Sequence, residues 1–137
     1  MKVILLLFLP VCIVFGRIPD WVNSVPPMSE TYYYRVGQAT GKTEDEAVRN
    51  AYKAVLRESA DAIGVSFDSK ANAVGSDSSF RAAGARGYNL SVNKVCQYTE
   101  DLISRNGYRA FVLCQVGIDP RTRPQFRTFD CRNNREH

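Results

Sequence analysis

Strand-forming residues recur with a two-residue period in several parts of this 137-residue chain. We expect strands over residues 32–39, 65–69, 88–99 and 108–118. Asn106 and Gly107, between the last two segments, are a strong signal for a tight turn, so these segments should form an antiparallel hairpin. The pattern therefore predicts a small, mainly antiparallel sheet of about four strands.

The alternation also assigns side chains to faces of this sheet. In the first segment it places three side chains on one face, namely Tyr32, Tyr34 and Val36. In the 88–99 segment a strict two-residue period places four on one face, namely Leu90, Val92, Cys96 and Tyr98. Both faces of the 108–118 segment are apolar, which predicts a central place in the sheet.

A longer period takes over between Gly41 and Gly64. Apolar residues, most of them Ala, recur there at spacings of three and four, and charged residues take the other side. Thr43 and Glu46 form a capping box at the start, and Gly64 is a natural terminator. We expect one long amphipathic helix, whose small side chains allow close packing on the sheet.

These elements predict an α+β fold in the order β-α-β-β-β, with the helix packed on the sheet. The domain should cover residues 32–119, between an irregular lead-in at 17–31 and an Arg-rich C-terminal tail at 120–137. A hydrophobic fraction of 45% and a charged fraction of 23% are ordinary for a globular protein. One core can therefore form without metals or a dense disulfide framework.

Residues 1–16 have the pattern of a secretory signal peptide, with Lys2 ahead of an apolar run that is too short to span a bilayer. Cleavage after Gly16 would leave Arg17 as the first residue of the mature chain. Two alternatives stay open, an uncleaved anchor and lipidation at Cys12, where the preceding Pro and Val are unfavourable. We therefore expect export from the cytoplasm.

Three Cys residues follow the leader, and export would place them where disulfides persist. Cys96 and Cys114 lie in the two strands of the expected hairpin, so a bridge between them is our first hypothesis. Cys131 could still pair with either one. The leftover thiol is better explained as a buried or incidental Cys than as an intermolecular link.

Arg residues dominate the last seventeen positions of a chain whose formal net charge is +4. We expect a solvated terminus there. The alternative is attraction of Arg121, Arg123 and Arg127 to an anionic surface, such as the outer membrane. We expect no nucleic acid as a partner.

The chain lacks the residue patterns of an enzyme site. Its only His is His137, at the chain end, where no rigid scaffold can hold it beside a nucleophile. No phosphate loop, dinucleotide fingerprint or metal-ligand spacing is present in the sequence. We therefore expect no catalysis, no cofactor and no small-molecule substrate.

Three blocks of the sequence resemble the LPP-twenty family of small bacterial envelope lipoproteins, which is similar to the N-terminal domain of the T-type flagellar assembly protein. The blocks are Pro19-Asp20-Trp21-Val22, residues 34–39 with Glu46, Ala47, Ala51 and Ala54, and residues 108–113. The resemblance covers residues 19–119. It implies a strand, a long Ala-rich helix, an antiparallel sheet and no cofactor. It also implies a protein placed at the outer membrane, which in some members is built into rings around the flagellar motor. We therefore expect export to the periplasm or outer membrane, with secretion as the alternative. The poor attachment site at Cys12 and the Arg-rich tail depart from the family's pattern.

Two functions follow from these observations. The first is a structural or assembly component of the bacterial envelope that self-associates or docks onto other envelope proteins. The resemblance adds association with the flagellum as one form of this role. The second is a small binding module for an anionic or glycan ligand. Six residues are candidate contacts, three for docking and three for charge: Trp21, Tyr33 and Arg35, then Arg121, Arg123 and Arg127.

Overall fold

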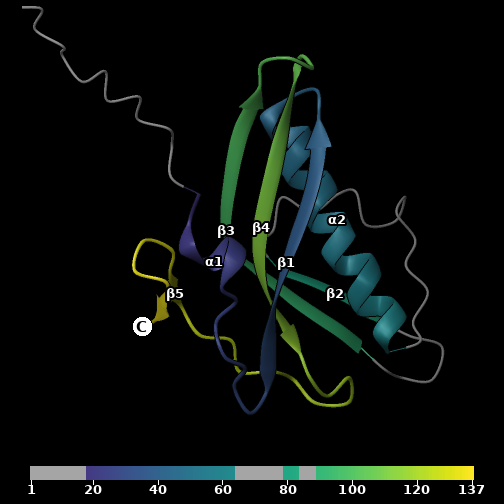
Figure 1. Ribbon diagram of the computed structural model, residues 1–137. Helices are drawn as coiled ribbons and strands as arrows, with labels where there is room; N and C mark the ends of the chain where they lie inside the picture. The colour runs from purple at the N-terminus through teal and green to yellow at the C-terminus, as the bar shows by residue number, and fades with distance from the viewer. Residues whose placement is uncertain (1–17, 64–78, 84–88) are drawn as a thin grey trace, which may run out of the picture.

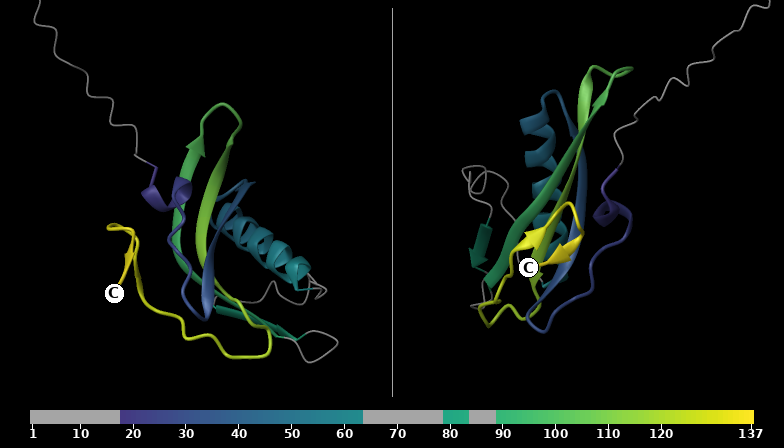
Figure 2. Two further views of the ribbon diagram at one scale, coloured as in Figure 1. Left: turned by 60° about the horizontal axis from the view of Figure 1, so that its bottom comes forward. Right: turned by 90° about the vertical axis from the view of Figure 1, so that its left-hand side faces the viewer.

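The computed structural model describes residues 18–63, 79–83 and 89–137. Its helices are α1 (Asp20–Asn23) and α2 (Glu44–Ala62), and its strands are β1 (Tyr32–Gly41), β2 (Ser79–Ala83), β3 (Asn89–Leu102), β4 (Gly107–Gly117), β5 (Phe129–Asp130) and β6 (Arg135–Glu136). An antiparallel sheet has the strand order β1-β4-β3-β2, and β5 pairs with β6 in a second sheet. Helix α2 covers one face of the larger sheet, and α1 and the C-terminal segment lie on the other side (Figures 1 and 2).

The predicted fold class requires correction. Residues in strands outnumber residues in helices in the described part of the chain. The strands form two sheets, because β5 and β6 occupy a region that we expected to be a tail. The lead-in contains a helical turn, α1, and strand β2 lies where no strand was predicted. The single-sheet order β-α-β-β-β is therefore wrong. The strand expected at 65–69 and the leader at 1–16 lie outside the described residues.

Helix α2 begins and packs as its sequence pattern indicates. The hydroxyl of Thr43 accepts a hydrogen bond from the backbone N–H of Glu46, which caps the first turn. Ala47 and Ala51 are fully buried against the sheet. A Cβ added at Gly37 of β1 would lie only 2.4 Å from the carbonyl oxygen of Ala51. Small residues on both elements therefore set the close approach of α2 to β1.

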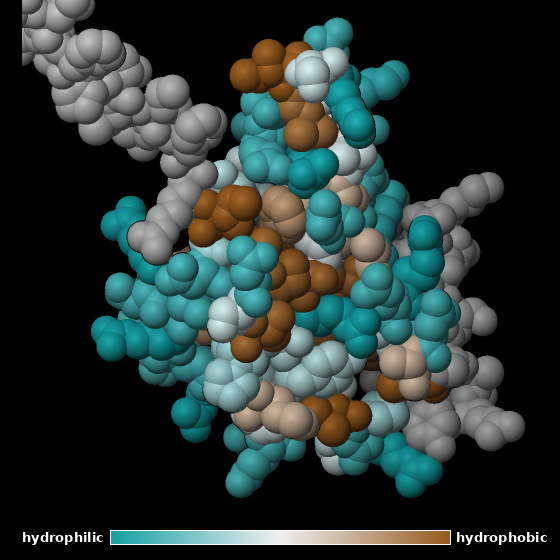
Figure 3. Space-filling model, viewed as in Figure 1, coloured by the Kyte–Doolittle hydropathy of each residue, from teal (hydrophilic) through white to brown (hydrophobic). Residues whose placement is uncertain are grey.

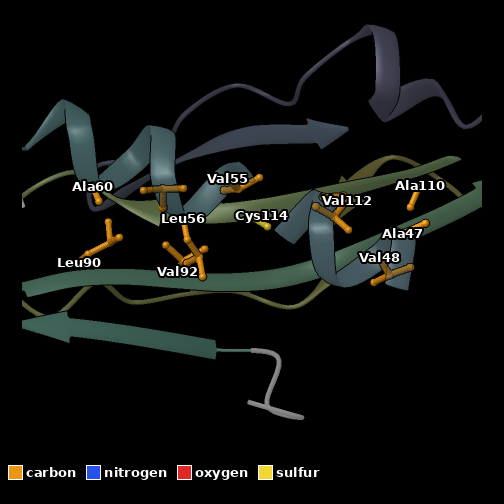
Figure 4. Packing of buried hydrophobic residues seen from close by; sticks show 12 residues of the cluster. Ala47, Val48, Val55, Leu56, Ala60, Leu90, Val92, Ala110, Val112 and Cys114 are labelled. Atoms are coloured by element: carbon orange, nitrogen blue, oxygen red, sulfur yellow. The ribbon is translucent and has the colours of Figure 1, made fainter. Parts of the chain in front are cut away.

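The larger sheet has an apolar cluster on each face, and β4 contributes to both. On the α2 face, Val55 and Leu56 pack with side chains of β3 and β4 (Figure 4). On the opposite face, Leu113 of β4 packs with Trp21 and Phe129 from the two ends of the described chain. Strand β4 lies between β1 and β3, which confirms its predicted central place.

A β-bulge divides β3 into two halves that serve different faces. Lys94 pairs with Cys114, but Cys96 pairs with Leu113, so Val95 is one residue more than β4 can match. Ahead of the bulge, Leu90 and Val92 belong to the cluster under α2, whereas Cys96 and Tyr98 beyond it pack on the opposite face. The prediction of one shared face for these four side chains is wrong, because the extra residue inverts the alternation.

Candidate interaction surface

The lead-in and the C-terminal segment meet on the face of the sheet that α2 leaves free. Trp21 of α1 is only 1% exposed, and Tyr32 at the start of β1 is equally buried. The ring of Tyr32 lies 5.7 Å from that of Phe126, and the ring of Tyr34 lies 5.4 Å from that of Phe129. We call these five aromatic side chains the terminal clasp. It joins both ends of the described chain to the sheet.

Hydrogen bonds reinforce the terminal clasp. The hydroxyls of Tyr32 and Tyr34 both donate to Oε1 of Glu136 in β6. Gln115 of β4 is fully buried, and its Nε2 donates to the Tyr34 hydroxyl at 3.1 Å and to the carbonyl of Arg127 at 2.8 Å. Its Oε1 accepts from the side chain of Asn93 at 3.1 Å. Buried polar groups require partners of this kind, so the C-terminal segment has a specified position on the sheet.

The same contacts shift the ionisation of the groups involved. Burial, and then the hydrogen bond to Glu136, raise the pKa values of Tyr32 and Tyr34 above their ordinary value. The bonds from the two hydroxyls lower the pKa of the Glu136 carboxyl. Glu136 is therefore an anion at neutral pH, and both hydroxyls keep their protons to donate to it.

The disulfide joins Cys96 to Cys131, across 35 residues of sequence. The expected bridge between Cys96 and Cys114 does not form, because the bulge turns Cys96 onto the face opposite Cys114. Cys114 is a free thiol in the core under α2, and burial raises its pKa. Residues 120–137 are thus covalently fixed to β3, and the expectation of a solvated tail requires correction.

The structure separates Trp21 from the other two predicted docking residues. Trp21 is buried in the terminal clasp and is only 1% exposed. Tyr33 and Arg35 lie on the α2 face, where the Arg35 guanidinium sits 5.7 Å from the ring centre of Tyr33 and forms a salt bridge of 3.0 Å with Glu58. These three residues therefore do not make one docking site. The candidate lipid-attachment residue, Cys12, lies outside the described residues.

The three Arg residues proposed for charge contacts have exposed side chains in the C-terminal segment, namely Arg121, Arg123 and Arg127. The backbone at either end of this run is held in place. The N–H of Arg121 donates to the carboxylate of Asp119, and the carbonyl of Arg127 accepts from Gln115. The charges therefore project from an anchored segment.

One hollow lies beside the disulfide. It has a volume of about 440 Å³, and Trp21, Gln97, Cys131 and Arg132 contribute to its walls. Elsewhere on the same side of the molecule, apolar side chains gather beside α1 and at the tip of the β3–β4 hairpin (Figure 3), where Ile103 is 88% exposed. The described residues contain no group of three side chains suited to hold a metal ion, and none of their helices is long and apolar enough to cross a membrane.

Sequence reasoning missed the free edge of β1. The carbonyl of Thr40 accepts from the side chain of Asn50, and that of Tyr32 accepts from the N–H of Ser29, so both point away from β4. Successive residues of an antiparallel strand direct their backbone groups to alternate sides. Val36 and Gln38 therefore also point outward, and no described residue bonds to their N–H or carbonyl groups. Local patterns signal a strand but not its place in a sheet.

Comparison with protein-family models, curated proteins and solved structures yielded no match to this chain.

Proposed function

We propose that the chain is an exported, non-catalytic protein that serves as a structural or assembly component of the bacterial envelope, in the periplasm or at the outer membrane. The observation that carries this proposal is the Cys96–Cys131 disulfide. Structural disulfides persist in oxidising compartments and are rare in the cytoplasm. The leader-like residues 1–16 and the resemblance to envelope lipoproteins support the same location, and flagellar association remains an expectation of that resemblance alone.

The use of polar groups in the described chain favours a scaffold over a reaction centre. Glu136, Gln115 and Tyr34 satisfy one another in the terminal clasp, and Arg35 is paired with Glu58. These are the arrangements that fix a single packing. Partners would be other envelope proteins or further copies of the chain.

Thiol trapping tests this proposal. The full-length chain and a variant lacking residues 2–16 are expressed in a bacterial host, quenched in acid, alkylated and mapped by mass spectrometry. We expect Cys96 and Cys131 to be linked in the full-length protein and alkylated in the leaderless variant. Recovery of the full-length protein from the cytoplasm with every Cys alkylated would refute export.

The same cells test lipidation. If Cys12 carries a lipid, the protein sediments with membranes and the Cys12→Ser variant is released into the soluble periplasmic fraction. If the leader is simply cleaved, the two proteins fractionate alike, and Arg17 is the first residue found.

A second function, binding of an anionic ligand, is favoured by the exposure of Arg121, Arg123 and Arg127. Its test is sedimentation with vesicles of anionic phospholipid at two salt concentrations. A binding module predicts salt-sensitive binding that is lost on replacing the three Arg residues by Ala. If the chain is an envelope scaffold that uses other surfaces, the wild type and the variant without the three Arg residues should sediment with the vesicles to the same extent.

A further inference from the structure

The open edge of β1 carries backbone groups that no other strand of the described chain uses. Strand β1 has ten residues and forms one border of the larger sheet, where it is seen in blue beside β4 (Figure 1). The outward N–H and carbonyl groups of Val36 and Gln38 have no partner among the described residues. Such an edge is a template for pairing with another strand.

The features with which proteins protect an open edge are missing from β1. It contains no Pro and no Lys, and its pairing with β4 is continuous from Tyr32 to Gly41, without a bulge. Its only charged side chain, Arg35, lies on the α2 face and is neutralised by Glu58. The edge of β1 is therefore suited to pair with another strand.

We propose that β1 pairs antiparallel with β1 of a second copy, about a two-fold axis at Val36, so that the two larger sheets become one. This inference deepens the proposed assembly function and rests on it. In this register Val36 lies opposite Val36 of the second copy, and Gln38 lies opposite Tyr34 of the second copy. The outward N–H and carbonyl groups of these residues then meet directly, as an antiparallel ladder requires.

The side chains favour this partner because large residues meet small ones across the axis. On the α2 face Tyr33 comes opposite Ala39 of the second copy, and Arg35 comes opposite Gly37. On the other face the two Val36 side chains meet, and each packs against the apolar cluster that contains Trp21. Cross-strand pairs of complementary size are the unit that stabilises a sheet.

The position of α2 is compatible with the same two-fold axis. Asn50 bonds to Thr40 and Glu58 bonds to Arg35, so the row that contains them lies above β1. Ala54 lies midway between Asn50 and Glu58 in this row. Gly37 of β1 lies beneath the neighbouring row of the helix, which contains Ala51 and Val55. An antiparallel pair of α2 helices would bring Ala54 opposite Ala54, and Asn50 opposite Glu58. A small residue thus stands where the two helices would come closest, and an amide donor meets a carboxylate.

Light scattering after size exclusion tests the edge with Gln38→Pro. This substitution removes an outward N–H without touching the β1–β4 ladder, and Pro is tolerated at such edge positions. We expect the wild-type protein to have twice the monomer mass and the Pro variant to dissociate at a concentration higher by about tenfold or more. Gln38→Thr keeps the N–H and should behave like the wild type. Circular dichroism confirms that both variants are folded.

Cysteine cross-linking tests the register. Val36→Cys should form a covalent dimer under mild oxidation, because the two residues face each other on the axis. Thr40→Cys is more exposed than Val36→Cys but would lie about 27 Å from its copy at the usual strand rise, and should not cross-link. A wild-type monomer at every concentration would overturn the inference, as would a dimer that Gln38→Pro leaves intact. Either result would leave the thiol-trapping test of export unaffected.

Discussion

Loss of the Cys96–Cys131 disulfide should weaken the fold by an amount that can be worked out from its position. The bond closes a loop across 35 residues. In the chain-entropy treatment, a loop of this length restricts the unfolded state by about 3.8 kcal/mol at 25 °C. With a urea dependence of roughly 1–3 kcal/mol/M, the unfolding midpoint should fall by about 2 M when the bond is reduced.

The assay is urea unfolding of the wild-type protein with and without a thiol reductant, followed by far-ultraviolet circular dichroism. Cys131→Ala should unfold near the reduced wild type in both conditions. Strands β5 and β6 have two residues each, too short to persist alone. In the reduced protein we therefore expect faster deuterium exchange at the amides of the C-terminal segment than at the amides of β4.

Cys114→Ala is the matched control, because Cys114 is buried on the opposite face and takes no part in the bond. This variant should lose roughly 1 kcal/mol through the small cavity it creates. Its sensitivity to reductant should remain. If Cys114→Ala abolished that sensitivity, Cys114 would be the true partner of Cys96, and the argument from the bulge would be refuted.

Three further predictions concern packing and ionisation. Gly37→Ala should destabilise the protein by about 2–3 kcal/mol in urea unfolding, because its Cβ would overlap Ala51 and Val55; Gln38→Ala, one residue further and exposed, should change little. Gln115→Leu should cost about 2 kcal/mol in the same assay, since it leaves buried hydrogen-bonding groups without partners. Burial raises the tyrosine pKa values in the terminal clasp, so the folded state holds those protons more tightly than the unfolded state. The resulting stability is complete below pH 10 and declines above it, which urea midpoints at pH 9 and pH 11 would reveal; equal midpoints would contradict it.

Local periodicity was sufficient to predict several elements. The three- and four-residue spacing located α2 between Gly41 and Gly64, and Thr43 caps it as expected. The turn at Asn106 was also predicted, and Asn106 has the positive φ of 49° that such turns favour. These features depend on residues that are neighbours in sequence. They can therefore be predicted from the sequence without knowledge of the fold.

Features that depend on distant residues could not be predicted in this way. The extra residue at Val95 has no local signature, yet it decides which face Cys96 occupies and hence its partner. Phe129 looked like part of a charged tail until its contacts with β1 were known. Trp21 was a docking candidate, but the fold buries it. The open edge of β1 likewise depends on strand order, which periodicity does not report.

The bulge at Val95 has a consequence for how this chain could vary in evolution. Strand β3 is in effect two short strands joined by one spare residue, and each half serves a different hydrophobic cluster. Deletion of that residue would exchange the inward and outward side chains of one half while leaving the other unchanged. A homologue without the insertion would then need a different means of securing its C-terminus. The length of this single strand therefore distinguishes chains that can carry the Cys96–Cys131 link from chains that cannot.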